Sequence, residues 1–329
     1  MKNNKINNLN IDFTKPRKNE KLKPWQVTGL VDAEGGFFLN ISKTDKGLIG
    51  FNIKLEFKVT QKNHSEGILH EIKEFFSCGN VVIDNRKTNT KKFQISALTD
   101  ILNVILPHFD KYPCLTSKFI NYKDWKKIAL IMSMKEHLTK TGMQKILNIW
   151  SNMNTKRSFE DKYNFCIRSL LMNINNNHFL ELSPYWVQAF LNGEGMFYNY
   201  IAEKKSRNKI YQGCDSSVEI AQNSHDVAVL LSIKQFFNAG YIKPKYDFFN
   251  LSECLKSRSI NRYILRDTKI IIDFVDQYPM LTRKHLDYLD WKKIVKLKID
   301  GAHKTEEGLA LMKKILSNMN SKRDSDHIE

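Results

Sequence analysis

The sequence predicts an α+β fold in which one α-β-β-α-β-β-α unit occurs twice. DKYPCLTSK from Asp110 matches DQYPMLTRK from Asp276, and YKDWKKI and YLDWKKI follow them at the same shift of 166 residues. Earlier in the unit, Glu34 matches Glu194 at a shift of 160. Shifts that grow slowly along a chain are typical of two diverged copies of one domain.

Each element of the unit is predicted from its own pattern. The opening helices, 24–33 and 184–193, each have Pro at an entry position. A first strand is expected at 37–43, and a second at 51–60, where apolar and polar residues alternate strictly. Such alternation indicates a sheet with one face on a core and one in water. The rest of the unit is predicted as a helix at 68–76, strands near Val81 and at 92–98, and helices up to Met153.

The two units are flanked by segments of a different composition. Residues 1–22 are polar and charged, and we expect a poorly ordered arm there. The first unit is predicted at 23–153 and the second at 184–325. Residues 154–183 join them and are predicted as a linker, because they include an Asn-rich stretch.

Composition narrows the class of function. The chain has 329 residues, and 52 Lys and Arg against 35 Asp and Glu leave a net charge of +17. This excess favours a polyanionic partner, with nucleic acid ahead of a membrane surface, although a solvated basic surface is the alternative. The five cysteines have neither zinc-site spacing nor a disulfide pattern, which indicates a reducing compartment. No run of 18 apolar residues is present, so we expect no membrane partner.

Small residues form a stripe on each opening helix. Gly29 and Ala33 lie four apart in the first copy, and Ala189 and Gly193 take the same places in the second. Residues at i and i+4 share a helix face, along which another backbone can approach closely. If the two helices pack through these stripes, their C-terminal ends meet.

That meeting would place two carboxylates together. Glu34 and Glu194 end the two helices, where the helix dipole already contributes negative charge. A divalent cation would relieve the repulsion, with these carboxylates and the backbone carbonyls of Ala33 and Gly193 as hard oxygen ligands suited to Mg²⁺. Each acid taken alone is better explained as an ordinary helix-end residue before a glycine turn; it is their recurrence in both copies, beside matched small-residue stripes, that favours a functional role.

The motifs LVDAEGGF (30–37) and FLNGEGMF (190–197) together resemble the LAGLIDADG homing endonucleases, in particular the single-chain, two-motif members encoded in fungal mitochondrial introns. The resemblance covers residues 24–325. It implies two four-stranded antiparallel sheets that form a saddle over double-stranded DNA, a monomer, a mitochondrial location, and Glu34 and Glu194 as ligands of Mg²⁺, in whose place Mn²⁺ or Ca²⁺ can bind. The second motif has Asn192 where the first has Asp32, and we expect little effect because the acid that follows is present.

The resemblance also implies two kinds of auxiliary catalytic residue. Family members place a polar residue at the end of the second strand, and here these are Gln61 in VTQ and Gln222 in IAQ. Both share the parity of the apolar face, so they should point towards the helix ends, although a strand end in solvent is the alternative. Lys118 and Lys284, in the matched LTSK and LTRK, are predicted as active-site cations; a surface helix start is the alternative.

The strand residues whose side chains point away from the core, with the opposite parity, should contact DNA. Arg, Lys, Asn and Gln on a ribbon in the major groove can contact base edges as well as phosphates. The predicted DNA-binding residues are Asn40, Ser42, Lys54, Lys58, Lys92 and Gln94 in the first unit, and Lys243, Lys245 and Arg262 in the second.

The prediction is therefore a metal-dependent enzyme that cuts both strands of a long DNA site and promotes intron mobility. The alternatives are an RNA maturase, which would bind intron RNA and assist splicing, and a DNA-binding protein without catalysis. Intact acids in both motifs favour the nuclease. The site should be asymmetric, because Lys54 and Lys58 correspond to Asp215 and Glu219 at a shift of 161.

Overall fold

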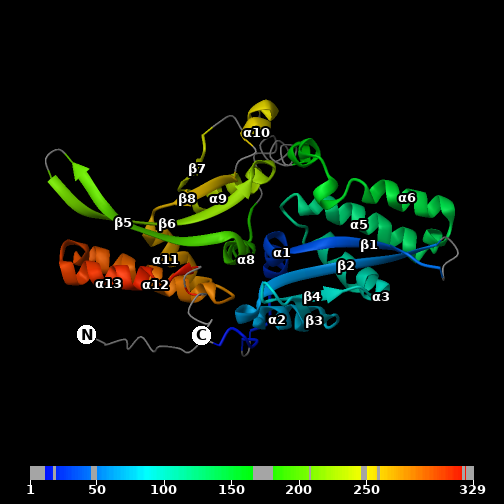
Figure 1. The fold of residues 1–329 in the computed structure, drawn as a ribbon, viewed down its shortest axis with the longest axis horizontal. Helices are drawn as coiled ribbons and strands as arrows, with labels where there is room; N and C mark the ends of the chain where they lie inside the picture. The colour runs from blue at the N-terminus through cyan, green and yellow to red at the C-terminus, as the bar shows by residue number, and fades with distance from the viewer. Residues whose placement is uncertain are drawn as a thin grey trace.

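The computed structural model describes residues 12–17, 20–45, 50–165, 181–206, 209–245, 250–257, 260–320 and 323. Two units of the same design lie side by side, and the helices α1 and α8 lie between them (Figure 1). The first unit contains α1 (Pro24–Glu34), β1 (Gly35–Lys43), β2 (Phe51–Lys62), α2 (Gly67–Phe76), β3 (Asn80–Asn85), β4 (Thr90–Ile95), α3 (Leu98–Asp100), α4 (Leu106–Lys111), α5 (Lys118–Ser133) and α6 (Lys140–Trp150).

The second unit repeats this order. It contains α8 (Pro184–Glu194), β5 (Gly195–Ser206), β6 (Lys209–Asn223), α9 (Val227–Phe237), β7 (Tyr241–Lys243), α10 (Leu251–Ser257), β8 (Ile260–Leu265), α11 (Thr268–Gln277), α12 (Lys284–Ile299) and α13 (Glu306–Leu316). The sheets are four-stranded and antiparallel, with the orders β1-β2-β4-β3 and β5-β6-β8-β7. The predicted α+β class and the doubled four-stranded unit are confirmed.

Strand parity places the core as the alternation predicts. Phe37 lies opposite Phe57 across the β1–β2 pair, and Val59 lies opposite Phe93 across the β2–β4 pair. All four side chains are fully buried. Helices α2, α4 and α5 cover this face, which leaves the other face of the sheet for polar side chains.

Matched hydrogen bonds fasten the tail helices to the sheets. Trp125 Nε1 donates to the Phe38 carbonyl at 3.0 Å, and Trp291 Nε1 donates to the Tyr198 carbonyl at 3.2 Å. After the tail, the Asn154 side chain donates to the Phe37 carbonyl at 3.0 Å. Asn154, the first residue of the predicted linker, therefore packs on the first unit. Of the remaining linker, 159–165 are helical and 166–180 lie outside the described residues.

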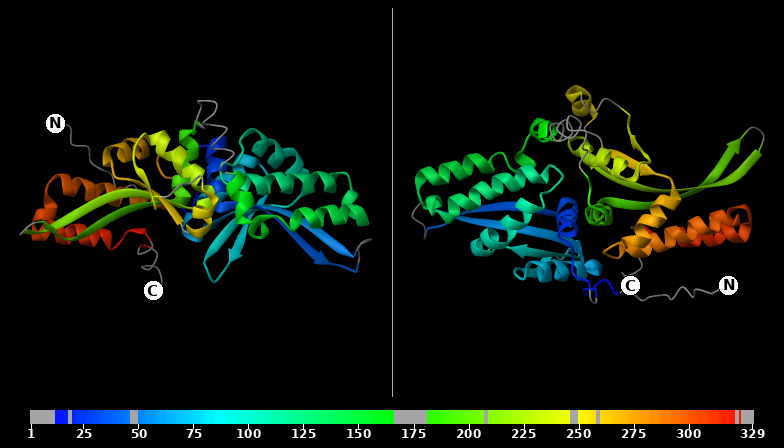
Figure 2. Two further views of the ribbon diagram at one scale, coloured as in Figure 1. Left: turned by 90° about the horizontal axis from the view of Figure 1, so that it is seen from above. Right: turned by 180° about the vertical axis from the view of Figure 1, so that it is seen from behind.

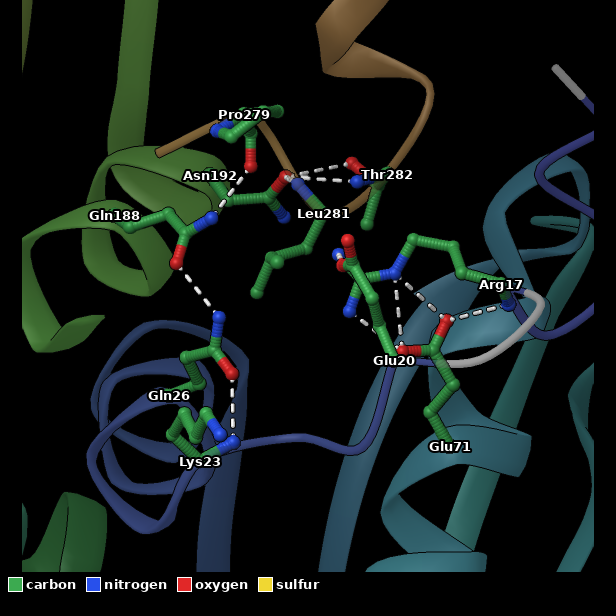
Figure 3. Close-up of polar contacts among 10 residues, drawn as sticks. All are labelled: Arg17, Glu20, Lys23, Gln26, Glu71, Gln188, Asn192, Pro279, Leu281 and Thr282. Atoms are coloured by element: carbon green, nitrogen blue, oxygen red, sulfur yellow. Dashed lines mark hydrogen bonds and ion pairs between the residues drawn. The ribbon is translucent and has the colours of Figure 1, made fainter. Parts of the chain in front are cut away.

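The prediction of a poorly ordered arm at 1–22 is wrong for its described part, residues 12–17 and 20–22. Phe13 and Leu22 are buried, and the Phe13 carbonyl accepts a hydrogen bond from Gly67 N at 3.1 Å. Arg17 lies on Glu71 of α2, with a shortest N···O distance of 2.7 Å (Figure 3). The Glu71 side chain is only 4% exposed, so this segment neutralises a carboxylate that would otherwise be buried alone.

The second unit departs from the first at its sheet edge. The β5–β6 ribbon is longer than the β1–β2 ribbon and extends away from the centre of the molecule (Figure 2). Helix α10 lies between β7 and β8, where the first unit has a turn between β3 and β4. Among the described residues, no helix has both the length and the apolar character needed to cross a membrane.

Candidate active site

The two opening helices pack through their small residues, as the stripes predict. A Cβ atom added to Gly29 would lie 2.7 Å from the Trp186 carbonyl oxygen and 2.8 Å from Ala189 Cβ. One added to Gly193 would collide with Ala33 Cβ. At the other end of the interface, Gln26 Nε2 donates to Gln188 Oε1 at 2.7 Å (Figure 3). The helices therefore run at backbone contact down to their acidic ends.

Glu34 and Glu194 meet at these ends in unequal surroundings. Glu34 is exposed and Glu194 is half-buried. Burial raises the pKa of Glu194; the charge of Lys118 opposes this rise, and the charge of Glu34 adds to it. The mutual repulsion of the two carboxylates is the electrostatic situation that the sequence predicts for a shared cation site.

The two predicted lysines hold the helix ends. Lys118 Nζ donates to the carbonyls of Val31 and Ala33, each at 3.0 Å. Lys284 Nζ donates to the carbonyls of Gly193, at 3.0 Å, and of Gly195. Burial lowers the pKa of Lys284 to about 8, while the Glu34 charge acts in the opposite direction. Neither lysine is a simple surface helix start.

The motif residue two positions before each glutamate, Asp32 or Asn192, has a structural role. Asp32 accepts hydrogen bonds from Leu115 N, Thr116 N and Thr116 Oγ1. In the second unit, Asn192 Oδ1 accepts the equivalent bonds from Leu281 N, Thr282 N and Thr282 Oγ1, at 2.9–3.1 Å (Figure 3). An amide oxygen replaces the carboxylate because the position needs only an acceptor, which explains why Asn is tolerated there.

The two predicted glutamines differ in what they reach. Gln222 hydrogen-bonds to the Glu194 carboxylate and so opposes the rise that burial causes in the pKa of that acid. Gln61 has the predicted parity, shared with Phe57 and Val59, and it pairs with Lys91 across the β2–β4 ladder. The structure thus brings Gln222 to an acid and gives Gln61 only the right strand face.

A cavity of about 330 Å³ lies on the Glu194 side of the site. It contains residues that the sequence did not single out, namely Lys162, His225 and Asp226. Asp226 joins the two units, since its carboxylate accepts from Ser117 N at 2.6 Å and from Ser117 Oγ at 2.9 Å. No repeat or motif marks these residues, so only the packing of the units reveals them.

The donor set fits a hard divalent cation. Glu34 and Glu194 supply two carboxylates, and the Ala33 and Gly193 carbonyls each keep a second lone pair beside the lysine bond. The described residues contain no group of three His, Cys, Asp or Glu side chains around one point. Backbone oxygens and water would therefore have to complete the coordination, as is usual for Mg²⁺.

The predicted DNA-binding residues of the first unit share one face of the sheet. Asn40 lies opposite Lys54, and Lys58 lies opposite Gln94, all with the parity opposite to the core. This face is not uniformly basic, because acidic side chains lie on it. Ion pairs join Lys92 to Glu56 at 2.8 Å and Lys58 to Asp84 at 3.7 Å.

In the second unit, Arg262 lies opposite Lys243 on the exposed face. Lys245 is exposed but follows the end of β7, so the strand-parity argument does not apply to it.

The pairs Asn40–Lys54 and Tyr200–Asp215 occupy equivalent ladder positions, as do Gly36–Lys58 and Met196–Glu219. The predicted charge reversal between the units therefore holds at equivalent places in the two sheets.

Comparison with curated proteins finds fungal relatives. Probable intron-encoded endonuclease 2 of Neurospora crassa is 29% identical over 304 residues, which are 88% of this chain and 63% of the relative. Probable intron-encoded endonuclease 3 of the same species is 26% identical over 93% of this chain and 56% of its own length. The chain thus spans less than two thirds of these relatives. Others are named as a mitochondrial protein of Saccharomyces cerevisiae and a protein in ND4 intron 1 of Podospora anserina, in agreement with the expected mitochondrial location.

Solved structures share the fold. The I-SmaMI LAGLIDADG homing endonuclease bound to cleaved DNA is 28% identical, with a TM-score of 0.77 over 93% of this chain and 100% of that one. The I-LtrWI homing endonuclease bound to target DNA is 27% identical, with a TM-score of 0.75 over 91% of this chain and 98% of that one. The LAGLIDADG endonuclease family model matches residues 27–129 and 189–295, so the C-terminal parts of both opening helices and both acids fall within it. This chain belongs to the LAGLIDADG endonuclease family.

Proposed function

We propose that this protein is a site-specific, divalent-metal-dependent DNA endonuclease that hydrolyses phosphodiester bonds on both strands of a long target. One observation carries the proposal. The backbone contact of α1 and α8 brings Glu34 and Glu194, from the two copies of the motif, to a single point between the two sheets. A protein that only bound DNA would gain nothing from two repelling carboxylates at that point.

Each residue of the site has a task in this proposal. Glu34 and Glu194 hold the cation, with the Ala33 and Gly193 carbonyls beside them. Bound Mg²⁺, or Mn²⁺ or Ca²⁺ in its place, would supply the activation of water and the stabilisation of charge on the phosphate. A structure of I-SmaMI with its uncleaved DNA target was obtained in the presence of calcium ions, which supports a divalent cation here. Gln222, at the Glu194 carboxylate, orients water in that half of the site.

The two basic lysines act differently from the acids. Lys118 and Lys284 hold the helix-end carbonyls, which fixes the two carboxylates in position. They also place positive charge near the phosphate to be cut, where it stabilises the developing negative charge.

We further propose that the protein acts as a monomer on an asymmetric site and promotes the mobility of a mitochondrial intron. The two units replace two subunits, so one chain covers both half-sites. Lys54 in one sheet and Asp215 in the equivalent place of the other cannot read the same base, since Lys donates to guanine acceptors and Asp accepts from the cytosine amino group. The intron-encoded relatives support the biological role.

Selection from a random duplex library, followed by incubation of the recovered duplex with Mg²⁺, tests the function. The wild-type protein should cut both strands with Mg²⁺ and neither with EDTA. Glu34→Gln and Glu194→Gln should each lower the cleavage rate by at least about 100-fold, because each removes a metal ligand. Binding to the same duplex should change less than about threefold, because the sheets supply most of the contacts. Full activity of either variant would refute the shared site.

A further inference from the structure

The cavity on the Glu194 side of the active site has a wall that comes from the connection between the units. Lys162 lies on the helical segment 159–165 and lines this cavity together with Glu194, Gln222 and Lys118. Its side chain is partly exposed.

Lys162 differs from the other charged groups of the cavity in its surroundings. Lys118 is held by two carbonyls, and Asp226 by Ser117. Asp32 accepts four hydrogen bonds. Within the part of the chain that the structure describes, the Lys162 ammonium group makes no hydrogen bond or ion pair. Lys162 is thus a half-buried cation beside a catalytic carboxylate, and no described residue accepts a hydrogen bond from its ammonium group. Such a group is suited to bind an anion supplied by the substrate.

The backbone that carries Lys162 is anchored on both units. Phe159 packs edge-on against His225 of the second unit, with ring centroids 5.8 Å apart. Phe165 packs on Phe119 of α5 at 5.6 Å, and Tyr163 is buried. These contacts hold the segment against the cavity, so the lysine is offered from a fixed position rather than from a free loop.

The repeat of the sequence gives the second unit no lysine at the position of Lys162. MNTKR at 153–157 and MNSKR at 319–323 align at a shift of 166, and the same shift carries Lys162 onto Ile328. Arg283, the counterpart of Ser117, is the cation at the corresponding junction of the units, and it donates to the Arg323 carbonyl at 3.2 Å. Arm residues 12–14 line the pocket beside Arg283.

We propose that Lys162 binds the phosphate group that lies beside Glu194, and that it does so for one of the two strands only. The inference rests on the proposed nuclease function and deepens it. Lys162 donates an N–H to a non-bridging oxygen of the phosphate to be cut, which holds that group against Glu194 and Gln222. Because Ile328 stands at the repeat position, the two strands are cut by unequal halves of one active site.

Strand-resolved cleavage of the selected duplex tests this proposal. Each strand carries its own fluorescent label, and single-turnover rates are measured for wild type, Lys162→Ala and Lys162→Arg. Lys162→Ala loses a charged hydrogen bond to the substrate, so the cleavage rate of one strand should fall by about tenfold or more and that of the other by less than about twofold. Lys162→Arg should restore most of the lost rate. Lys73→Ala is the matched control, because this exposed lysine lies on α2, away from the cavity.

Binding gives a readout that does not depend on cleavage. In Ca²⁺, the slope of log affinity against log salt should fall by about 0.9 in Lys162→Ala, as expected for one lost phosphate contact, and stay unchanged in Lys73→Ala. If wild type cuts the duplex while Lys162→Ala leaves both strand rates and the slope unchanged, or slows both strands equally, the proposed phosphate contact is wrong and the nuclease function stands. If wild type cuts no selected duplex, the function and the inference built on it both fall.

Discussion

The contact between α1 and α8 predicts that a single methyl group at Gly29 will damage catalysis more than stability. A Cβ atom there would lie 2.8 Å from Ala189 Cβ, about 0.6 Å short of the 3.4 Å at which ordinary contact begins. The Trp186 carbonyl oxygen, at 2.7 Å, belongs to the backbone of α8 and cannot rotate away. Gly29→Ala must therefore push the helices apart.

The two effects of this substitution can be compared in size. Overpacking of a core costs about 1–3 kcal/mol, and the better helix propensity of Ala returns about 1 kcal/mol, so the net loss of unfolding free energy should be about 0–2 kcal/mol. The same movement separates Glu34 from Glu194. A misplacement of about 1 Å in a catalytic group can lower a rate by about 100-fold, so the cleavage rate should fall by at least about tenfold.

Urea unfolding and single-turnover cleavage measure the two quantities on the same protein. Ala189→Gly removes one of the two close atoms, so the double variant Gly29→Ala/Ala189→Gly should recover part of the lost rate, and a double-mutant cycle gives the coupling. If Gly29→Ala cleaves at the wild-type rate, the helices do not pack at backbone contact, and close packing of small residues is not what brings the two acids together.

Two further predictions concern stability. Arg17→Ala should lower the free energy of unfolding by about 3 kcal/mol, because it leaves Glu71 buried without its partner. The double variant with Glu71→Gln should recover part of the lost free energy. An unchanged urea midpoint in Arg17→Ala would contradict the docking of residues 12–17. Burial lowers the pKa of His108 to about 4, below its ordinary value of 6.5, so the unfolded chain takes up a proton first as the solution is acidified. The free energy of unfolding should therefore fall between pH 6.5 and pH 4, by about 3 kcal/mol at most. The fall should be smaller in His108→Gln, because glutamine cannot titrate. Equal pH profiles of unfolding free energy for the two proteins would show that other groups cause the fall.

Much of the fold was already present in the sequence, because it depends on local periodicity and on repetition. The alternation from Phe51 to Val59 placed β2 and its core face, and the 166-residue shift placed the second unit. Glu34 and Glu194 were found because each ends a helix whose small-residue stripe recurs in the other copy. Gln222 was found from the family resemblance, and its strand parity agreed with that assignment. Each of these inferences uses residues that are close in sequence or related by the repeat.

The tertiary structure decided what depends on the approach of segments that are distant in sequence. The composition of residues 12–22 predicts disorder, but Arg17 is ordered by Glu71, a carboxylate 54 residues away. Lys118 and Lys284 could have pointed into solvent, and only the packing of α5 and α12 brings their ammonium groups to the helix-end carbonyls. Lys162 lies in a segment without motif or periodicity. It lines the cavity because of the distance at which the two units pack. The small residues allow a close approach but do not fix this distance, which determines the side chains that share the cavity between the units.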